Sequence, residues 1–397
     1  MKTRVPAPEA TRKRIAELLN GDLDKSALMR EAMPLRIEET LEAEVTEGLR
    51  RPYYGRSEAA QRYRNGIRMG RLKTAEGLVE YAVPQVTGTE TPWHSEVREA
   101  LAGRIGELER LAIERYARGL SMRDIERTFT DATGHCVLTK TAASEVAERL
   151  WEDYQTFATR DLSASNVLYL FLDGVHERLH LGQPREAVLC ARGITATGAK
   201  VLLGLSPGTK EDTASAKEFL RDLKTRGLKD PVLVATDGAP GLIRAVTEVF
   251  PRSLRQRCLT HQLRNLEGQV PGEFWREVKA YALAAYQASS PTLAQIARDE
   301  FVQRFGQTWP AATACFEDDF EACIAQLKLP IAHRPAIRTT HLRERLFGEE
   351  RRRSKVIPHA FGERPVLKLM YAALIRASPS WRRILIQEFE QKQIEEL

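Results

Sequence analysis

The sequence predicts a mixed α/β fold, in which a central sheet is preceded by helices and interrupted by further helices. One observation is the run NVLYLFLDGV (166–175), whose continuous apolar residues are typical of a strand buried on both faces. A second is the order of segments from residue 165, which reads as three strands, a helix, a strand and a helix. A third is the recurrence of apolar residues every three or four positions in 96–157 and 267–330, which indicates helices.

The totals restrict the class of protein. The 397 residues are enough for two or three domains, each with its own core. Its composition, with 43% hydrophobic and 29% charged residues, is that of a globular protein. No apolar run approaches the ~18–20 residues that a membrane helix needs. The N-terminus lacks the apolar core of a secretory signal, and the five cysteines include no C-x-x-C pair. We therefore expect a cytoplasmic protein with reduced thiols and no membrane partner.

The N-terminal region combines helices with a strongly basic segment. Residues 8–48 carry the helical period, and GLVEYAVPQVTG (77–88) alternates like a short strand. Segment 50–73 holds eight Arg or Lys and one Glu, a net charge of +7, whereas the whole chain carries +6, so the rest sums to −1. Arginines interleaved with tyrosines favour phosphate contacts with DNA, although a solvated basic loop has the same composition. The candidate contacts are Arg62, Arg64, Arg68 and Arg71.

Residues 96–157 are expected to be all-helical. A long helix ends at Gly119, a short helix begins after Ser121, and a longer one begins after Thr139. A short helix, a turn and a longer helix resemble a helix-turn-helix, which places the start of its second helix in the major groove. An ordinary three-helix bundle is the alternative. The candidate DNA contacts on the longer helix are Lys140, Thr141 and Ser144.

The region from 165 contains the predicted sheet. Its expected strands are 166–175, 185–194, 199–206 and 231–237, with helices at 213–227 and 241–250. Further helices follow at 267–330, and a last one covers 364–378. The expected domains are 1–95 (helical and basic), 96–160 (helix-turn-helix-like), 161–266 (first part of the sheet domain), 267–332 (helical) and 333–397 (remainder of the sheet domain, with C-terminal helices).

The stretch FLDGVHERLH (171–180) matches the H-E-x-x-H pattern of zinc proteases. On a helix, His176 and His180 would be about 6 Å apart and could share one zinc ion. The flanking residues indicate a strand, on which the same histidines are about 13 Å apart. We therefore expect two histidines on a hairpin, with no shared metal.

Asp173 and Asp237 occupy equivalent places, because each follows a buried strand and precedes glycine. Sites in open α/β sheets form at the carboxyl ends of strands. If the two strands are neighbours, the carboxylates lie close together and repel each other unless a cation is bound between them. Mg²⁺ suits such oxygen ligands. The alternative is that each Asp-Gly pair simply opens a turn.

A third carboxylate is expected near residues 341–355. Glu344, Glu349 and Glu350 are the candidates, and helical spacing puts Glu344, Gly348 and Arg351 on one stripe. A glycine beside the acid would let DNA approach closely, and Arg351 could pair with a phosphate. An exposed charged helix is the alternative.

Several longer motifs, in this order, resemble the bacterial mutator-type transposases, which are insertion-sequence enzymes with a ribonuclease-H-like Asp-Asp-Glu core. The motifs are RNGIRMGRLKTAEGLVEYAVPQV, YARGLSMRDIER, YLFLDGVH, RGLKDPVLVATDGAPGL, QRCLTHQLRN and TTHLRERLFGEERRRSKVIPHAF. The resemblance covers most of the chain. It implies a ribonuclease-H-like mixed-sheet core that is interrupted by a helical insertion and preceded by mostly helical DNA-binding domains.

The resemblance also implies a site and a reaction. The triad would be Asp173, Asp237 and Glu344, holding two Mg²⁺ ions, with Mn²⁺ as a substitute, for DNA cleavage and strand transfer. Cys258 and His261 match a C-x-x-H signature that we interpret as shaping the core near the site, with a plain buried strand end as the alternative. His341 replaces the usual Asn, which leaves a catalytically inactive DNA-binding regulator as the alternative.

The implied partners are double-stranded DNA, both terminal inverted repeats and target, and further copies of the chain in a homodimer or larger assembly. The implied location is the bacterial cytoplasm at the nucleoid. Besides Arg351, the basic run offers two further DNA contacts, Arg352 and Arg353.

Overall fold

The computed structural model divides into two compact units, residues 1–116 with 120–148, and 117–119 with 149–397. The residues that it describes are 6–19, 25–55, 62–74, 77–88, 93–101, 106–117, 120–130, 136–177, 179, 186–207, 213–340, 362–378 and 381–397.

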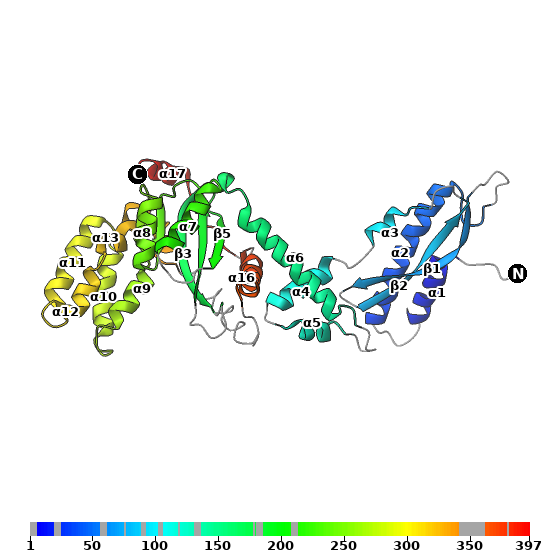
Figure 1. Ribbon diagram of the computed structural model, residues 1–397, viewed down its shortest axis with the longest axis horizontal. Helices are drawn as coiled ribbons and strands as arrows, with labels where there is room; N and C mark the ends of the chain where they lie inside the picture. Colours follow the sequence, from blue (N-terminus) through cyan, green and yellow to red (C-terminus); the bar gives the residue numbers. More distant parts are fainter. Residues whose placement is uncertain are drawn as a thin grey trace. The chain divides into compact units, whose positions relative to one another are not determined.

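The first unit opens with a helical pair against a two-stranded antiparallel sheet (Figure 1). Its elements are α1 (Ala7–Leu19), α2 (Lys25–Leu49), β1 (Tyr63–Thr74), β2 (Gly77–Thr87) and α3 (Glu96–Ala100). Ile37 and Leu41 of α2 pack on Leu72, Tyr81 and Val83, which share one face of the sheet. The strand expected at 77–88 is confirmed as β2. The basic segment was not expected to form a strand, but its second half lies in β1. Fully buried positions occur only at Leu72 and Thr74, so most of this strand carries no alternating apolar pattern.

A buried carboxylate joins the elements of this part. Glu38 accepts a hydrogen bond from the Thr11 hydroxyl at 2.6 Å and another from the backbone N–H of Ala82 at 2.9 Å. The first contact holds α1 on α2. The second occupies an N–H that β2 does not use in pairing with β1. Glu38 therefore closes one edge of the ribbon that β1 and β2 form.

Three helices follow in the first unit: α4 (Gly106–Ala117), α5 (Met122–Thr128) and α6 (Lys140–Thr159). Their core includes Leu108, Ile125, Phe129, Leu138 and Val146. The expected capping box between Ser121 and Asp124 is present, and the Thr139 hydroxyl accepts from the N–H of Ala142. The connection between α5 and α6 is longer than the three or four residues of a helix-turn-helix turn, and it carries an isolated bridge between Thr130 and Cys136. Residues 149–159 of α6 belong to the second unit.

The second unit contains a five-stranded mixed sheet in the order β5-β4-β3-β6-β7, which confirms the expected α/β class. The strands are β3 (Val167–Glu177), β4 (Glu186–Thr195), β5 (Lys200–Pro207), β6 (Leu233–Thr236) and β7 (Leu254–Arg257). β3, β4 and β5 are antiparallel, whereas β6 and β7 run parallel to β3. The short strand β7 was not expected.

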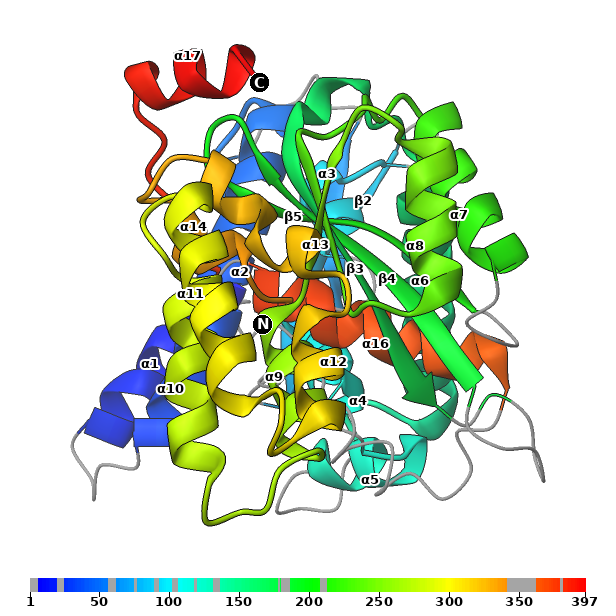
Figure 2. The same ribbon diagram turned by 90° about the vertical axis from the view of Figure 1, so that its left-hand side faces the viewer.

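The two faces of this sheet pack against different helices (Figure 2). One face carries Leu170 and Leu172 and is covered by α7 (Thr213–Thr225) and α8 (Pro240–Val249). The other carries Tyr169 and Phe171 and packs against Ile337, which belongs to α14 (Arg334–Ile337). Both faces are therefore buried, as the continuous apolar strand of 166–175 predicts.

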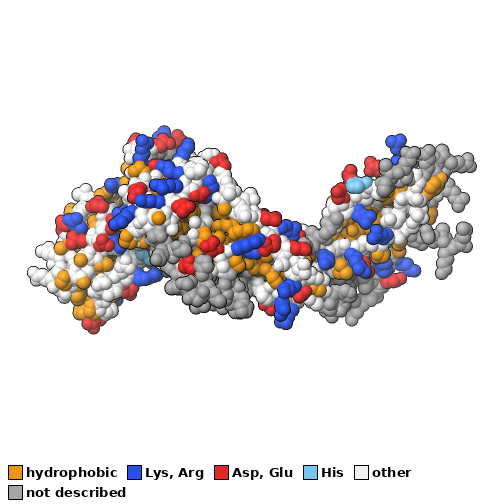
Figure 3. All heavy atoms as spheres, viewed as in Figure 1, with side chains coloured by type: hydrophobic (Ala, Val, Ile, Leu, Met, Phe, Trp, Pro, Cys, Tyr) orange, Lys and Arg blue, Asp and Glu red, His pale blue; other side chains and the backbone are white. Residues whose placement is uncertain are grey.

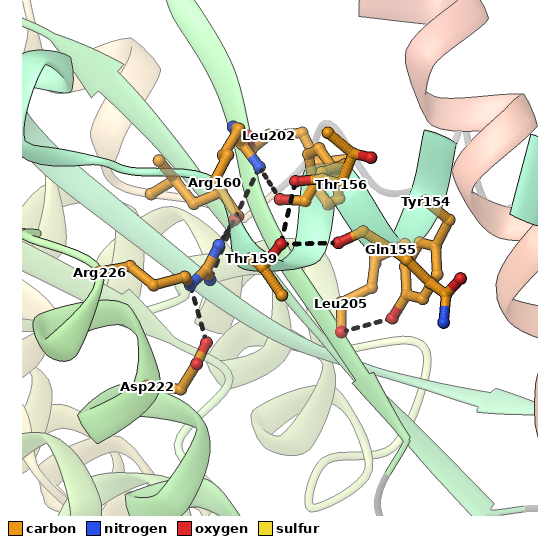
Figure 4. Close-up of polar contacts among 11 residues, drawn as sticks. Tyr154, Gln155, Thr156, Thr159, Arg160, Leu202, Leu205, Asp222 and Arg226 are labelled. Carbon is orange, nitrogen blue, oxygen red and sulfur yellow. Dashed lines mark hydrogen bonds and ion pairs between the residues drawn. The ribbon is translucent and has the colours of Figure 1, made fainter. Parts of the chain in front are cut away.

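Two arginines cover the outer edge of β5 (Figure 4). Arg160, just after α6, donates to the carbonyls of Leu202 and Leu203, and Arg226, which is paired with Asp222, also donates to Leu203. These bonds satisfy carbonyls that no further strand pairs.

A helical region follows β7, as expected for 267–330. Its elements are α9 (Leu259–Glu267), α10 (Trp275–Tyr286), α11 (Pro291–Phe305), α12 (Pro310–Glu317), α13 (Phe320–Ile324) and a 3-10 turn (Ala325–Lys328). An aromatic core fills it, in which the rings of Phe301 and Phe316 stack 3.8 Å apart. The last elements are α16 (Glu363–Ala377), which confirms the helix expected at 364–378, and α17 (Glu388–Glu395), which was not expected.

The structure also bears on the zinc-protease pattern at 176–180 and on the expectation of no membrane helix. His176 and Glu177 lie in β3, where His176 is paired with Ala187 of β4, so the helix that H-E-x-x-H needs is absent there. The hairpin prediction is thus confirmed for His176, whereas His180 lies outside the described residues. Among the helices of the described ranges, none has the length and apolar character needed to cross a membrane.

Candidate catalytic site

The two aspartates stand level with each other on neighbouring parallel strands. β3 pairs with β6 through Tyr169↔Leu233 and Phe171↔Ala235. Two positions further along each chain come Asp173 and, directly after β6, Asp237. Neighbouring strands are about 4.8 Å apart, so the two carboxylates emerge close together. The condition that the sequence left open, whether these strands are neighbours, is therefore met.

Local geometry fixes Asp237 at the end of β6. Its Oδ1 accepts a hydrogen bond from the N–H of Ala239 at 3.0 Å, directly before α8 begins at Pro240. Gly238 has a φ of +95°, and a Cβ there would lie 2.7 Å from Nε of Arg257. Only glycine fits both demands. The Asp-Gly pair thus opens a turn, and the same turn holds the half-buried carboxylate at the strand end.

A buried cation lies beside Asp173. Strand alternation puts Asp173, Cys190 and Arg192 on the same face, and Asp173 is paired directly with Cys190 of β4. Asp173 is 1% exposed and Arg192 is 3% exposed. Burial lowers the pKa of the Arg192 guanidinium, while the neighbouring thiol and the Asp173 carboxylate act against that shift. The guanidinium remains charged and offsets part of the negative charge at this end of the sheet.

Arg192 also fixes the chain that leads to the third predicted carboxylate. Its Nη2 donates to the carbonyl of Thr340 at 3.1 Å. The N–H and hydroxyl of Thr340 donate to Sγ of Cys258 at 3.3 and 3.4 Å. All polar groups of Thr340 are thus hydrogen-bonded, the carbonyl to β4 and the N–H and hydroxyl to the residue before α9. The structure thus places Thr340 against Arg192, which lies on the same face of the sheet as Asp173.

Cys258 and His261 form one cluster with Thr340. Burial alone would raise the pKa of the Cys258 thiol, but hydrogen bonds with His261 and Thr340 outweigh it and lower the pKa to about 7. Within the described ranges, no group of three or more His, Cys, Asp or Glu side chains is placed to hold a metal ion. The contacts of this pair are with the protein itself, at the point where the chain leaves α14.

The third carboxylate and its neighbours lie outside the described residues. These are His341, Glu344, Glu349, Glu350, Arg351, Arg352 and Arg353. The two remaining carboxylates, Asp173 and Asp237, are hard oxygen donors at one sheet end. This donor chemistry fits Mg²⁺ or Mn²⁺ better than zinc, which favours nitrogen and sulfur.

The arginines of the basic segment fall into two groups. Arg62, Arg68 and Arg71 are exposed, although Arg71 contacts Glu80 at 2.9 Å. Arg64 has only 14% of its side chain exposed, and it contacts Glu42 at 3.4 Å and the Thr46 hydroxyl at 2.9 Å, both on α2. Arg64 is therefore largely buried against α2, whereas the other three arginines are exposed.

The other candidate DNA contacts lie together at the start of α6. Lys140, Thr141 and Ser144 are all exposed there. The backbone N–H of Lys140 donates to the Glu126 carboxylate of α5 at 2.8 Å, which fixes the beginning of α6. Sequence reasoning missed Arg192 and Thr340 as parts of the catalytic region. A charged residue inside the apolar strand AVLCARGI was the available signal for Arg192.

Comparison with known proteins adds independent information. The family model "Transposase, Mutator family" matches residues 9–383. The transposase for insertion sequence element IS6120 of Mycolicibacterium smegmatis is 32% identical over 270 residues, which cover 68% of this chain and 84% of that protein. The transposase for ISRM5 of Rhizobium meliloti is 28% identical over 355 residues (89% and 88%), and that for IS406 of Burkholderia multivorans is 29% identical over 371 residues (92% and 94%).

Proposed function

Because this chain belongs to the Mutator family of transposases, we propose that it binds the ends of an insertion sequence and cuts and joins DNA strands with Asp173, Asp237 and Glu344. The observation that carries the proposal is the level placement of Asp173 and Asp237 on adjacent parallel strands. Two buried or half-buried carboxylates at one sheet end need positive charge, and a metal-dependent phosphoryl-transfer site supplies it.

We further propose that the sheet is a ribonuclease-H-like core. Three antiparallel strands followed by two parallel ones support this, with the two aspartates on the central pair β3 and β6. The separate aromatic core of α10 to α13 supports a helical insertion at 267–332. We keep 1–95, 96–160, 161–266, 267–332 and 333–397 as the proposed division into domains.

The proposed cofactor is Mg²⁺, with Mn²⁺ as a substitute, held by Asp173, Asp237 and Glu344. When bound, two such ions supply activation of a water or a DNA 3′-hydroxyl and neutralise charge on the reacting phosphate. The protein's own contribution is positional. Turn geometry holds Asp237, Arg192 offsets the charge of Asp173, and the contacts at Thr340 set where the segment with Glu344 begins.

The proposed partners are double-stranded DNA, both transposon ends and target, and further copies of this chain in a homodimer or larger assembly. Arg62, Arg68 and Arg71 would contact phosphates, with Arg351, Arg352 and Arg353 adding contacts near the catalytic site. Lys140, Thr141 and Ser144 would contact bases. The proposed location is the bacterial cytoplasm, at the nucleoid.

A strand-transfer assay tests the proposal. The full chain is incubated with a duplex that ends in the inverted repeat recovered from DNA flanking the gene, with Mg²⁺, Mn²⁺ or EDTA. We expect cleavage and joining with either metal ion and none with EDTA. Metal-independent DNA binding without cleavage would instead favour the catalytically inactive regulator, as the substitution of His341 for the usual Asn allows.

A further inference from the structure

The ribbon of β1 and β2 has one open face. Leu72, Tyr81 and Val83 face α2, so alternation turns Ile67 and Met69 to the opposite side. Ile67 is 60% exposed and Met69 is 55% exposed. Tyr63 is also exposed, but beyond the bulge between Arg64 and Ile67 it pairs with Thr87, on the same side of the ribbon as Tyr81 and Val83, so it is not part of this face. The cluster of Ile67 and Met69 on a solvated strand indicates a binding surface.

The charge around this face identifies the partner. Residues 62–74 contain no acidic side chain, and Arg62 and Arg68 are exposed and make no ion pair with any described residue. On the visible side of this unit in Figure 3, apolar side chains lie among Lys and Arg side chains. Two copies of the strand would repel each other, whereas a polyanion would be attracted. DNA therefore fits this surface better than a second copy of the chain.

The shape of the ribbon is suited to the same partner. The major groove of B-DNA is about 12 Å wide and admits a two-stranded antiparallel ribbon. Apolar side chains that enter the groove contact the 5-methyl group of thymine, while flanking arginines pair with phosphates. The ribbon is rigidly mounted, because Glu38 closes its β2 edge and Arg64 ties β1 to α2.

We propose that the open face of β1, through Ile67 and Met69, enters the major groove of DNA and discriminates sequence by contacts with thymine methyl groups. The inference rests on the proposed function of binding insertion-sequence ends. It changes the role of the basic segment from phosphate attraction alone to sequence recognition. Arg68, which pairs with Val83 and is exposed, supplies phosphate contacts, and Arg64 ties β1 to α2.

The test uses the full chain in EDTA, so that binding is measured without cleavage. The probes are the inverted-repeat duplex, a scrambled duplex of equal length, and an inverted-repeat duplex with uracil in place of every thymine, which lacks the methyl groups. We expect the wild type to bind the uracil duplex roughly tenfold more weakly than the thymine duplex. The double variant Ile67→Ser, Met69→Ser should bind both equally, with unchanged affinity for scrambled DNA.

Two controls make the outcomes distinct. Arg68→Gln should weaken binding to all three duplexes and keep the preference for thymine. Both variants replace exposed side chains, and unchanged melting temperatures confirm that folding is intact. The inference is overturned if the double variant retains the thymine preference, or if it changes the sedimentation of the free protein without changing DNA binding, which would make this face an interface between copies. A wild-type chain that binds none of the duplexes would instead overturn the proposed function.

Discussion

At the scale of single residues, the candidate site combines two carboxylates with one buried guanidinium. Asp173 lies beside the buried Arg192, whereas Asp237 is half-buried and held by a turn N–H. A neutral substitution should therefore change the free energy of unfolding differently at the two aspartates. Removing the charge of Asp173 leaves a buried guanidinium without its acidic neighbour, which destabilises a protein. Removing the charge of Asp237 relieves repulsion between carboxylates.

The first prediction concerns the proposed triad. Asp173→Asn, Asp237→Asn and Glu344→Gln should each reduce strand cleavage and joining by orders of magnitude, because ligand charge and metal activation are lost together. Binding to DNA ends should survive, since it depends on the first unit. Thermal unfolding should show a loss of stability for Asp173→Asn and none for Asp237→Asn.

Glu349→Gln and Glu350→Gln are the matched controls for the third ligand and should keep most activity. If Glu344→Gln remains active while either control is inactive, the third carboxylate is assigned to the wrong residue. If all five variants cleave DNA normally, the metal-site interpretation of Asp173 and Asp237 fails.

The second prediction concerns pH. The pKa of Cys258 is lowered from 9.0 to about 7 in the folded chain, so the thiolate stabilises the fold fully above pH 9. That contribution is lost as the pH falls through 7. The difference in free energy of unfolding between the wild type and Cys258→Ala should therefore grow from pH 7 to 9, by roughly 2–3 kcal/mol. Urea unfolding at several pH values measures it, and a difference independent of pH would contradict the lowered pKa.

At the scale of elements, the start of α6 and the ribbon of β1 and β2 belong to the same unit but expose different kinds of side chain. The start of α6 offers a hydroxyl-rich, exposed turn whose backbone is fixed by Glu126. The connection before it is longer than in a helix-turn-helix, so the packing of α4, α5 and α6 is that of a three-helix bundle with a helix-turn-helix-like pair. The exposed side chains at the helix start remain suited to reading base edges.

The third prediction tests that helix. Lys140→Ala and Thr141→Ala should each reduce the preference for transposon ends over scrambled DNA, by about 1–3 kcal/mol per lost base contact. Melting temperatures should not change, since both side chains are exposed. Competition binding with the two duplexes measures the preference. Full preference in both variants would assign this helix to packing instead of recognition.

At the scale of the whole molecule, charge is concentrated in one short segment. Residues 50–73 carry +7, while the chain as a whole carries +6. Attraction to DNA should therefore come mainly from this segment and should weaken steeply with salt. The structure divides the segment further, because Arg64 is engaged with α2 while Arg62, Arg68 and Arg71 are exposed.

The fourth prediction follows from that division. Changing Arg62, Arg68 and Arg71 together to Gln should weaken binding to end and random DNA alike, and should reduce the log–log salt slope by roughly 0.9 for each lost phosphate contact. Arg64→Gln should instead lower the melting temperature, with a smaller effect on the slope. Filter binding across a salt series measures the slope for both variants. An unchanged slope in the triple variant would show that other residues make the phosphate contacts.

The sequence by itself determined the buried strands, most helices and the candidate site residues. Continuous apolar runs identified β3 and β6, and their Asp-Gly ends identified Asp173 and Asp237, because burial and turn chemistry are local properties. It also excluded the zinc-protease interpretation, since His176 follows a strand pattern. The strand β1 escaped detection because its open side carries the apolar Ile67 and Met69 while its α2 side carries Arg68 and Gly70, so polarity does not alternate with exposure.

Only the tertiary structure decided which of these residues meet. The pairing of β3 with β6 joins segments more than sixty positions apart, and nothing in either strand specifies its neighbour. The same holds for Thr340, which hydrogen-bonds to Arg192 and Cys258 from two different elements, and for Arg64, which contacts Glu42 of α2 while Arg68 is exposed. Such contacts depend on how whole elements pack, because side chains distant in sequence become neighbours only after the backbone is placed.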